Sequence, residues 1–513
     1  MSLLDDVSIV VTPNGYKAGE LYAVIPVPTE GAEEGTNMDF SSGTSPWALN
    51  SNWSLGGVGV IADGTSNSTV WQNSVVEDNK QYIVTYTLTD FLQGTVNVEL
   101  AGSHGISRTI AGTYTEVITS GTSPTTRITF EGSGNFQVTL SNVIVKEWTG
   151  ADMDVTRATD ATRVDENGLI EDVLANVPRI DYTGGGCPHI LAEPMRTNLA
   201  TYSESFGSGK YFSIYGEANE VSSNNTSPSG TENATQIIST GQGKLYAFIS
   251  LPANTTYSLS FYAKNVDATE VQSRILASGG SGGSNMTAVS YISQLSTTEW
   301  TKITHIFTTN STAVQYYVFI SNALNIGGNI QIWGAQLEEG SYATSYIPNF
   351  GTALGVTRNQ DIFTRDGIGS LINSTEGVLF VEMAALSDDG VAKYLTMNDG
   401  SSNNDVRIYF NTASNGISAL LKSTTGATQA FLSYTVTDTT AFHKIAFVYA
   451  VNRFELWVDG EKRAEDLSGI APVGLTTLEF SRASNFLPFF GKVKQLQVYN
   501  TALSPTQLDA LTS

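Results

Sequence analysis

Aromatic side chains that stand among asparagine and serine residues are the first candidates for chemistry in this sequence. A protein binds a sugar when an exposed aromatic ring stacks on its C–H face and nearby amide or carboxylate groups bond its hydroxyls. The aromatic residues in such surroundings are Trp47, Trp53, Trp71, Tyr211 and Tyr215. They predict individually weak carbohydrate-binding sites in two stretches of the chain. The alternative for each ring is a place in a hydrophobic core.

Acidic loops near residue 400 are candidates for binding a metal. Asp388 and Asp389 lie in the loop sequence SDDG, and Asp399 lies in NDGSSNND. Calcium is a hard cation that takes several oxygen ligands from flexible loops. Calcium is therefore a possible cofactor, and turn formation is the alternative role of these aspartates. No other cofactor is expected.

The acidic residues do not have the arrangement that a glycosidase needs. Hydrolysis of a glycosidic bond requires two carboxyl groups that flank the bond. Glu382 stands alone in its predicted strand, and Glu455 and Asp459 lie on either side of a strand end. The histidines lie in four different segments: His104, His189, His305 and His443. The sequence therefore predicts no catalytic residue and a protein that is not an enzyme.

Composition limits the partners of the chain. Its 513 residues are enough for three or four domains at roughly 150 residues each. The formal net charge is −23 and the lysines and arginines do not cluster, which argues against nucleic acid as a partner. No stretch reaches the roughly 18 apolar residues that span a membrane, and acidic residues stand where a signal peptide would carry basic ones. We expect no membrane insertion and synthesis in the cytoplasm without a signal peptide.

Short runs in which apolar and polar residues alternate recur along most of the chain. Examples are QYIVTYTLTDF, TYSLSFYAKN and FQVTLSNVIVKEW, which are separated by glycine or asparagine turns. A period of two with turns between the runs is the pattern of antiparallel β-sandwiches. The same plan occurs from Asn37 to Trp148 and again in a stretch that ends near Gly340. Its opening DF…W strand and closing NV.V.E strand resemble those of carbohydrate-binding-module-like jelly rolls.

The segment from Met153 to Phe206 follows neither a helical nor a strand period. Prolines and the Gly184–Gly186 run break regular structure, yet apolar residues are scattered through the segment. Arginines stand among carboxylates that they could pair with: Arg157, Arg163, Arg179 and Arg196 among Asp160, Asp165, Asp181 and Glu193. This composition predicts a packed, irregular connector rather than a disordered linker.

A Val-Thr-Arg triplet follows each predicted sandwich. The first triplet begins at Val155 and the second at Val356. The spacing from the triplet's arginine to the next one is six residues in the first case and seven in the second. This loose echo favours a duplicated unit of sandwich plus connector.

The connector closely resembles a segment that recurs in bacteriophage tail-fibre and other virion structural proteins. The matching strings, over about fifty residues, are RATDATRV, GLIE, NVPRIDY, GGCP, EPMRTNL and YSE. The segment departs from that pattern at His189, Ala192 and Met195, where relatives more often carry apolar residues or a glutamine. The resemblance implies an elongated virion protein that contacts the host, and it implies no reaction.

The C-terminal part carries a second set of specific signals. In FELWVDG (454–460), alternate residues are expected on opposite faces of a strand, and the Asp-Gly pair is expected to form a tight hairpin turn. Ser504, Pro505 and Gln507 fit the N-cap, first position and capping box of a short helix. The strings FHKIAFVYA, LWVDG and FGKVKQLQVYNTALS closely resemble those of laminin-G-like, concanavalin-A-like jelly rolls. Phe442-His443 stands where that family usually has Trp-His.

The N-terminal residues form a unit of their own. The apolar runs SIVV and ELYAVIPVP are broken at PNG and predict a short pair of strands. We expect this segment to attach the chain to other virion proteins. In relatives the ELYAVIP opening leads directly into the RAT run, so the first sandwich is expected to be an insertion between them.

The sequence predicts an all-β chain of tandem antiparallel β-sandwich (jelly-roll) domains with irregular connectors and a C-terminal concanavalin-A-like jelly roll. The expected parts are an N-terminal attachment segment (1–30), a carbohydrate-module-like β-sandwich (31–150), an irregular connector (151–200), a second carbohydrate-module-like β-sandwich (201–350), a short connector (351–371) and a laminin-G-like jelly roll (372–513).

The resemblances imply a phage virion structural protein, a tail fibre or receptor-binding fibre that contacts host cell-surface glycans through its sandwiches. We expect it on the surface of the virion and, by analogy with phage fibres, as a homotrimer. The alternatives are a capsid decoration or head-fibre protein and a tailspike-like polysaccharide depolymerase.

Overall fold

The computed structural model describes residues 7–13, 29–63, 67–149, 153–207, 210–215, 218–239, 244–278, 285–312, 315–322, 328–484 and 486–513. These residues form antiparallel β-strands almost throughout, and α1 (Pro505–Thr512) is the one α-helix among them. The predicted all-β fold class is confirmed. In the described ranges, no helix has the length and apolar character needed to cross a membrane.

The chain divides into two compact units. Unit 1 comprises Met1–Ala23, Met153–Val173 and Pro178–Ser513, and unit 2 comprises Val24–Asp152 and Leu174–Val177. Unit 2 is the first sandwich, whereas unit 1 contains the second sandwich and the C-terminal domain. The first sandwich therefore interrupts unit 1 in the sequence, and its origin as an insertion remains a prediction.

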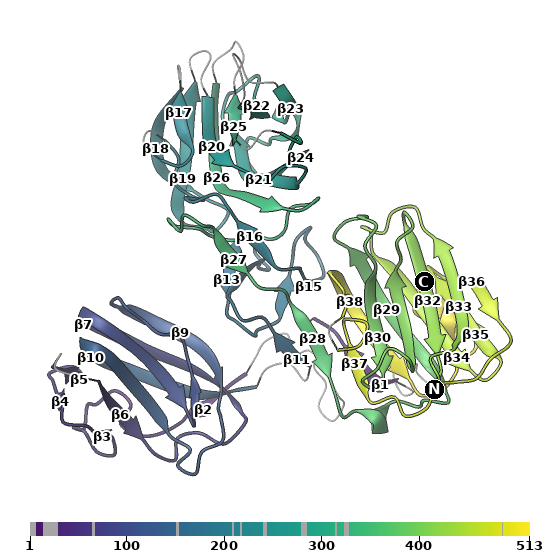
Figure 1. The fold of residues 1–513 in the computed structure, drawn as a ribbon, viewed down its shortest axis with the longest axis horizontal. Helices are drawn as coiled ribbons and strands as arrows, with labels where there is room; N and C mark the ends of the chain where they lie inside the picture. Colours follow the sequence, from purple (N-terminus) through teal and green to yellow (C-terminus); the bar gives the residue numbers. More distant parts are fainter. Residues whose placement is uncertain are drawn as a thin grey trace. The chain divides into compact units, whose positions relative to one another are not determined.

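The first sandwich is one nine-stranded antiparallel sheet around a single hydrophobic core (Figure 1). Its strands are β2 (Thr29–Glu33), β3 (Ala48–Leu49), β4 (Trp53–Leu55), β5 (Val60–Ala62), β6 (Ser68–Gln72), β7 (Gln81–Leu100), β8 (Ser103–His104), β9 (Gly112–Thr119) and β10 (Ile128–Thr149). The long strands β7 and β10 pair on both sides of a register shift next to Gly94 and Gly134, whose φ angles are +84° and +73°. Two separate sheets were expected. Instead, β7 and β10 each continue from one half of the sandwich into the other, because glycine permits the irregular backbone at the register shift between the halves.

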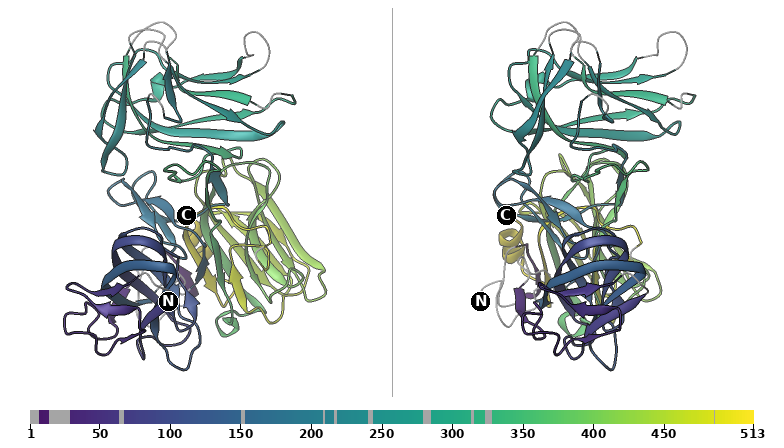
Figure 2. Two further views of the ribbon diagram at one scale, coloured as in Figure 1. Left: turned by 60° about the vertical axis from the view of Figure 1, so that its left-hand side comes forward. Right: turned by 90° about the vertical axis from the view of Figure 1, so that its left-hand side faces the viewer.

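The second sandwich has two five-stranded sheets, which Figures 1 and 2 show in teal and green. The first contains β17 (Ser213–Tyr215), β20 (Lys244–Ser250), β25 (Gln315–Asn322), β22 (Gln272–Ala277) and β23 (Asn285–Ser290) in that order. The second contains β18 (Ala218–Thr226), β19 (Glu232–Ser239), β26 (Gly328–Glu339), β21 (Thr256–Asn265) and β24 (Thr301–Thr308), and the short 3-10 helix η2 (Ile292–Gln294) precedes β24. Leu259 and Phe261 of the second sheet share one buried cluster with Val318 and Ile320 of the first.

The C-terminal domain also consists of two sheets, and strands of the connector extend both of them. One sheet runs β14 (Arg179–Asp181), β15 (His189–Ala192), β38 (Gly491–Tyr499), β29 (Glu376–Ala385), β34 (His443–Ala450), β35 (Arg453–Val458) and β36 (Glu461–Asp466). The other runs β11 (Asp154–Thr156), β28 (Ile362–Arg365), β37 (Thr477–Glu479), β30 (Lys393–Asn398), β31 (Asp405–Phe410), β32 (Gly416–Lys422) and β33 (Thr428–Thr435). The rest of the connectors forms the pairs β12 (Ala161–Val164) with β13 (Ile170–Val173) and β16 (Arg196–Asn198) with β27 (Val356–Arg358), followed by the 3-10 helix η3 (Gly369–Leu371).

The N-terminal run SIVV belongs to the C-terminal domain. It forms β1 (Val7–Val11), which pairs with residues 496–499 of β38, while β15 pairs with residues 491–493 of the same strand. Ile9 and Val11 are completely buried. The second predicted run, ELYAVIPVP, lies outside the described residues, so the expected strand pair and its attachment role remain predictions.

Two local predictions in the C-terminal domain are confirmed. Asp459 and Gly460 both have positive φ angles, 49° and 79°, and join β35 to β36 as a two-residue hairpin turn. In α1, the Ser504 side chain accepts from the Gln507 backbone N–H, and the Gln507 side chain accepts from the Ser504 backbone N–H. This helix packs Leu508 into a cluster with Val378 and Trp457 on the outer face of the β38-containing sheet.

Candidate carbohydrate-binding surface

Two of the three predicted tryptophans of the first sandwich are core residues. Trp47 is 5% exposed, packs 5.0 Å from the Phe40 ring and donates its indole N–H to the Asn37 carbonyl. Trp53 is 4% exposed and packs 5.3 Å from the Phe136 ring. Neither ring offers a free face to a sugar, because each fills the space between strands of the sandwich.

Trp71 occupies a different environment. It lies on β6 opposite Thr129 of β10, is only partly buried, and has the Arg127 guanidinium 6.0 Å from its ring centre. Of the predicted tryptophans, Trp71 is therefore the one that keeps some surface for a ligand.

The two predicted tyrosines of the second sandwich have different outcomes. Tyr211 packs edge-on against Phe212, with ring centres 5.3 Å apart, and lies against the hydrophobic core. Burial raises the pKa of Tyr211 to about 12, and its hydroxyl has no hydrogen-bond partner among the described residues. The side chain of Tyr215 lies outside the described part of the chain.

The aspartates predicted to bind calcium are bonded to protein groups. Asp388 accepts from the Ser414 hydroxyl at 2.6 Å, and Asp389 lies 2.5 Å from the Lys393 ammonium. Asp399 accepts from the Ser401 hydroxyl and from the Asn404 side chain, at 2.7 Å and 2.9 Å. These contacts match the alternative role in turns, and the structure does not gather the three carboxylates into one group.

An aromatic surface that the sequence analysis did not single out lies on the first sheet of the second sandwich. Its rings are Tyr246 and Phe248 of β20 and Tyr317 and Phe319 of β25, hereafter the aromatic face. Residues that alternate with them on the same strands, such as Leu245 and Val318, are completely buried in the core. The four rings therefore point away from the core, on the open side of the sheet.

The rings of the aromatic face touch one another. Phe248 lies 4.7 Å from Tyr317, and Tyr246 lies 5.6 Å from Phe319, between ring centres. Strand register produces this contact, because Tyr246 is paired with Phe319 and Phe248 with Tyr317. Phe248 is 44% exposed. Tyr246 and Tyr317 are half-buried and Phe319 is buried, so Phe248 is the ring of this face that is most free to stack on a ligand.

Polar side chains flank the aromatic face on its neighbouring strand. Arg274 and Gln272 of β22 alternate with the buried Ser273 and Ile275, so they point to the same side as the rings. Arg274 is paired in register with Phe319. Aromatic rings beside guanidinium and amide groups provide both the stacking surface and the hydrogen bonds that a sugar requires.

A sequence signal for this surface existed. KLYAFIS (244–250) and QYYVFISN (315–322) each place two aromatic residues at a spacing of two. That spacing puts both rings of each strand on one face, but it does not tell which strands are neighbours. The aromatic face requires β20 and β25 to pair, and they are separated by four other strands in the sequence.

Two of the four predicted connector arginines, Arg157 and Arg179, are buried in an ionic cluster within unit 1. The cluster contains Arg157, Arg179, Arg358, Glu193 and Asp361, hereafter the arginine cluster, each at most 3% exposed. Asp361 pairs with Arg157 at 2.9 Å and also with Arg179. Glu193 pairs with Arg179 and Arg358, both at 2.7 Å. The arginines of both Val-Thr-Arg triplets thus meet in one cluster.

Hydrogen bonds complete the arginine cluster. Ser345 donates its backbone N–H and hydroxyl to Glu193, at 2.8 Å and 2.6 Å. Burial alone would raise the pKa of Glu193, but the charges of Arg358 and Arg179 hold it well below its usual range. The connector therefore supplies a structural joint, which connects its strands to the end of the second sandwich at Ser345.

A cleft of about 770 Å³ opens beside the arginine cluster within unit 1. Its walls include Tyr262, Trp300 and Lys302 of the second sandwich together with Gly184–Gly186 of the connector and Lys492 of β38. The cleft combines aromatic and charged groups, so it is a second surface of unit 1 suited to a small polar ligand.

The acidic residues considered for catalysis are engaged in separate contacts. Glu382 lies 3.3 Å from the Lys494 ammonium. Glu455 accepts from the Trp457 indole at 2.9 Å, and Asp459 lies 2.6 Å from Nδ1 of His443. Each carboxylate thus has a partner that positions a strand or a turn.

Two parts of the chain match known protein families. Residues 379–509 match the concanavalin A-like lectin/glucanases superfamily, and residues 201–324 match a carbohydrate binding domain family. The chain therefore contains a laminin-G-like, concanavalin-A-like domain and a carbohydrate-binding module domain. The aromatic face lies within the second of these. No curated protein sequence matches the chain.

Several solved structures are similar to parts of the chain. The CBM40 module of the Ruminococcus gnavus IT-sialidase, bound to alpha2,3 sialyllactose, is 19% identical over 27% of this chain and 83% of its own, with a TM-score of 0.25. The tandem CBM22 modules of Paenibacillus barcinonensis Xyn10C are 10% identical over 61% of this chain and 98% of their own, with a TM-score of 0.22. Domains LG4-5 of the mouse laminin alpha1 chain are 11% identical over 50% of this chain and 90% of their own, with a TM-score of 0.19.

Proposed function

We propose that the protein is a non-enzymatic phage virion protein, a tail fibre or receptor-binding fibre, that binds host-surface glycans through the aromatic face. The aromatic face carries the proposal. Four rings in mutual contact, one of them 44% exposed, stand beside Arg274 and Gln272 in the domain that matches a carbohydrate binding domain family. Such a surface binds the apolar faces of sugar rings and their hydroxyls together.

The virion role rests on the connector. Its strings resemble those of tail-fibre proteins, and their residues Arg157, Arg179 and Glu193 form the buried joint of unit 1. A fibre that presents several copies of a weak glycan site gains avidity of about 10²–10⁴ without new contacts. Trimerisation would supply such copies, and it belongs to this proposal.

The non-enzymatic part of the proposal is supported by the acidic residues. Glu382, Glu455 and Asp459 are each paired with a different neighbour, whereas a glycosidase needs two carboxyl groups across one bond. The tailspike-like depolymerase is the less favoured alternative for this reason.

Incubation of the full chain with capsule or lipopolysaccharide of the host tests binding and cleavage together. The proposal expects the polysaccharide to be retained by the immobilised protein, with no oligosaccharide released over time. Progressive release of oligosaccharides would replace the fibre with a depolymerase. No retention of any host polysaccharide would contradict glycan binding.

The position of the protein on the particle can be tested separately. Gold-labelled antibodies against the first sandwich should mark the tail of the virion in electron micrographs. Labelling of the capsid would instead favour the decoration or head-fibre alternative, and unlabelled particles would contradict a virion role.

A further inference from the structure

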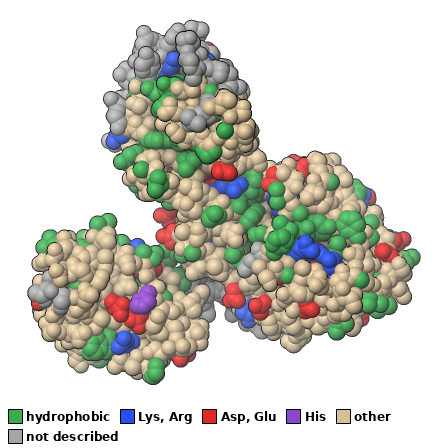
Figure 3. All heavy atoms as spheres, in the orientation of Figure 1, with side chains coloured by type: hydrophobic (Ala, Val, Ile, Leu, Met, Phe, Trp, Pro, Cys, Tyr) green, Lys and Arg blue, Asp and Glu red, His purple; other side chains and the backbone are tan. Residues whose placement is uncertain are grey.

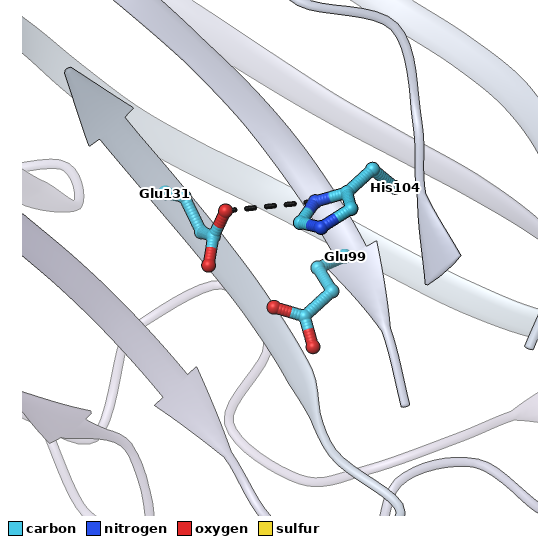
Figure 4. Close-up of side chains that lie close together, drawn as sticks. All are labelled: Glu99, His104 and Glu131. Carbon is cyan, nitrogen blue, oxygen red and sulfur yellow. Dashed lines mark ion pairs between the residues drawn. The ribbon is translucent and has the colours of Figure 1, made fainter. Parts of the chain in front are cut away.

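A histidine and two glutamates converge on the outer surface of the first sandwich. His104, Glu99 and Glu131 each offer one ligand atom, and these atoms all lie within 4.8 Å of one another (Figure 4). Nδ1 of His104 is 3.5 Å from Oε2 of Glu131. Figure 3 shows a purple histidine beside red acidic side chains on the surface of this sandwich.

Three neighbouring strands place these side chains. The two-residue turn Ala101-Gly102, with φ angles of +47° and +95°, folds β8 back onto β7 so that His104 lies opposite Glu99. On the other side of β7, Glu131 of β10 lies opposite Asn97. Residues 97 and 99 point to the same face of β7, so all three candidate ligands stand on one side of the sheet.

The cluster of Glu99, His104 and Glu131 holds more acidic groups than basic ones. Glu99 is only 7% exposed, and among the described residues no lysine or arginine forms an ion pair with it. One carboxylate oxygen of Glu99 lies within 4.8 Å of a carboxylate oxygen of Glu131. Two carboxylates so close together repel each other unless a proton or a cation lies between them.

A buried hydroxyl beside the cluster also lacks a partner. Thr129 lies directly opposite Glu99 on β10 and is completely buried, and its hydroxyl makes no hydrogen bond within the described part of the chain. Buried polar groups are normally satisfied, so this hydroxyl next to a buried carboxylate could hydrogen-bond a ligand of the neighbouring cluster.

We propose that Glu99, His104 and Glu131 bind one divalent transition-metal ion of the Zn²⁺ class. One imidazole nitrogen with two carboxylate oxygens suits zinc and its neighbours, whereas calcium and magnesium prefer oxygen ligands throughout. His104 is exposed, so the ion would face solvent and keep at least one coordination position for water. This inference is independent of the aromatic face, which belongs to the other unit.

Calorimetric titration of the chelator-treated full chain with Zn²⁺, Ca²⁺ or Mg²⁺ tests the site. Zn²⁺ should bind with a stoichiometry of one, and Ca²⁺ and Mg²⁺ should bind at least about tenfold more weakly. His104→Ala and Glu99→Gln should each weaken Zn²⁺ binding at least about tenfold. Glu77→Gln, which changes a carboxylate that is 73% exposed and paired with Lys80, should leave it unchanged.

Each contrary result is decisive. Zn²⁺ binding that survives His104→Ala would place the metal elsewhere, and a flat titration of the wild-type chain would exclude the site. Melting in the presence of chelator separates misfolding from ligand loss. The His104→Ala protein should melt like the wild type there, because His104 is an exposed side chain, while Zn²⁺ should raise the melting temperature of the wild type and not that of His104→Ala.

Discussion

Five charged side chains in the interior of unit 1 link the connector to its neighbouring strands. The arginine cluster places three arginines against two carboxylates, and every one of these side chains is removed from solvent. A buried ion pair adds little net stability, but breaking one leaves an uncompensated charge in the interior. The five residues of the arginine cluster are therefore sensitive structural positions.

Substitution of Arg179 tests this interpretation. Arg179→Met would leave Glu193 and Asp361 each with one arginine fewer and should lower the free energy of unfolding of unit 1 by about 3–5 kcal/mol. Lys462→Met, which breaks a surface pair with Glu465, is the control and should change it by less than about 1 kcal/mol. Hydrogen exchange of the backbone amides of β14 and β15 measures the change in the free energy of unfolding for each of the two variants. Equal effects of the two substitutions would show that the cluster has no special structural role.

A buried histidine should make the second sandwich sensitive to acid. Burial lowers the pKa of His305 to about 4, although the Ser273 hydroxyl lies 2.8 Å from its Nδ1. The unfolded chain takes up a proton near pH 6.5 and the folded chain does so only near pH 4, so stability is complete above pH 6.5 and is lost as the pH falls between these values.

The free energy of unfolding of the second sandwich should fall by about 2 kcal/mol between pH 7 and pH 5, and His305→Asn should abolish this fall. Hydrogen exchange of β24, corrected for the intrinsic rate, measures the local free energy at each pH. The same loss in the variant would mean that other groups cause the acid sensitivity.

At the scale of elements, the edge of β38 is shared by two segments that are far apart in the sequence. β15 covers one end of the strand and β1 the other, so the C-terminal sheet includes strands from the N-terminus, the connector and the last part of the chain. Removing β1 would expose both the edge and the core beneath Ile9.

Paired alanine substitutions in β1 test its role. Ile9→Ala should lower the free energy of unfolding of the C-terminal domain by about 2–5 kcal/mol, because Ile9 is completely buried. Val10→Ala is the matched control, since Val10 is the next residue on the strand and is only partly buried. Hydrogen exchange of β38 reports both. Identical protection in the two variants would contradict the pairing of β1 with β38.

Local patterns predicted local structure well. The Asp459-Gly460 turn and the Ser504 capping box were predictable because turn and cap chemistry depends on residues that are adjacent in sequence. Long-range pairing was not predictable. The position of β1 and the aromatic face both depend on which strands are neighbours, and the alternation of apolar residues is the same for any partner strand.

The positions of the surface aromatic rings were not predicted from the sequence. Tryptophans in polar surroundings were reasonable candidates, yet Trp47 and Trp53 fill the core because a large ring buries more apolar surface there than at the rim. The exposed Phe248 and the half-buried Tyr317 lie in regular strands whose other face is buried. Sequence alone does not say which face of such a strand meets solvent when both carry apolar residues.

At the scale of the whole chain, the first sandwich stands in the sequence between two segments of unit 1. Its first strand, β2, pairs with the end of its last strand, and Thr29 lies directly opposite Thr149. The ends of the module are therefore neighbours, which is the geometry that permits insertion or removal of a domain without disturbing its host.

Excision of the module tests this organisation. A chain in which residues 29–149 are replaced by a short Gly-Ser linker should retain the folded unit 1, because β1 and the connector need only a loop between them. Circular dichroism and the melting temperature of unit 1 should be close to those of the full chain. A variant that is unfolded or aggregated would show that unit 1 depends on the first sandwich.

The most direct test of the account measures the affinity of the full chain for a polysaccharide of its host, with and without the aromatic face. Phe248→Ala combined with Tyr317→Ala should weaken binding at least about tenfold, since exposed aromatic side chains dominate such contacts. Phe431→Ala, which removes a ring that is 57% exposed on β33 of the C-terminal domain, should leave the affinity unchanged. Unchanged binding by the double variant would contradict the central claim that this protein holds glycans on the aromatic face.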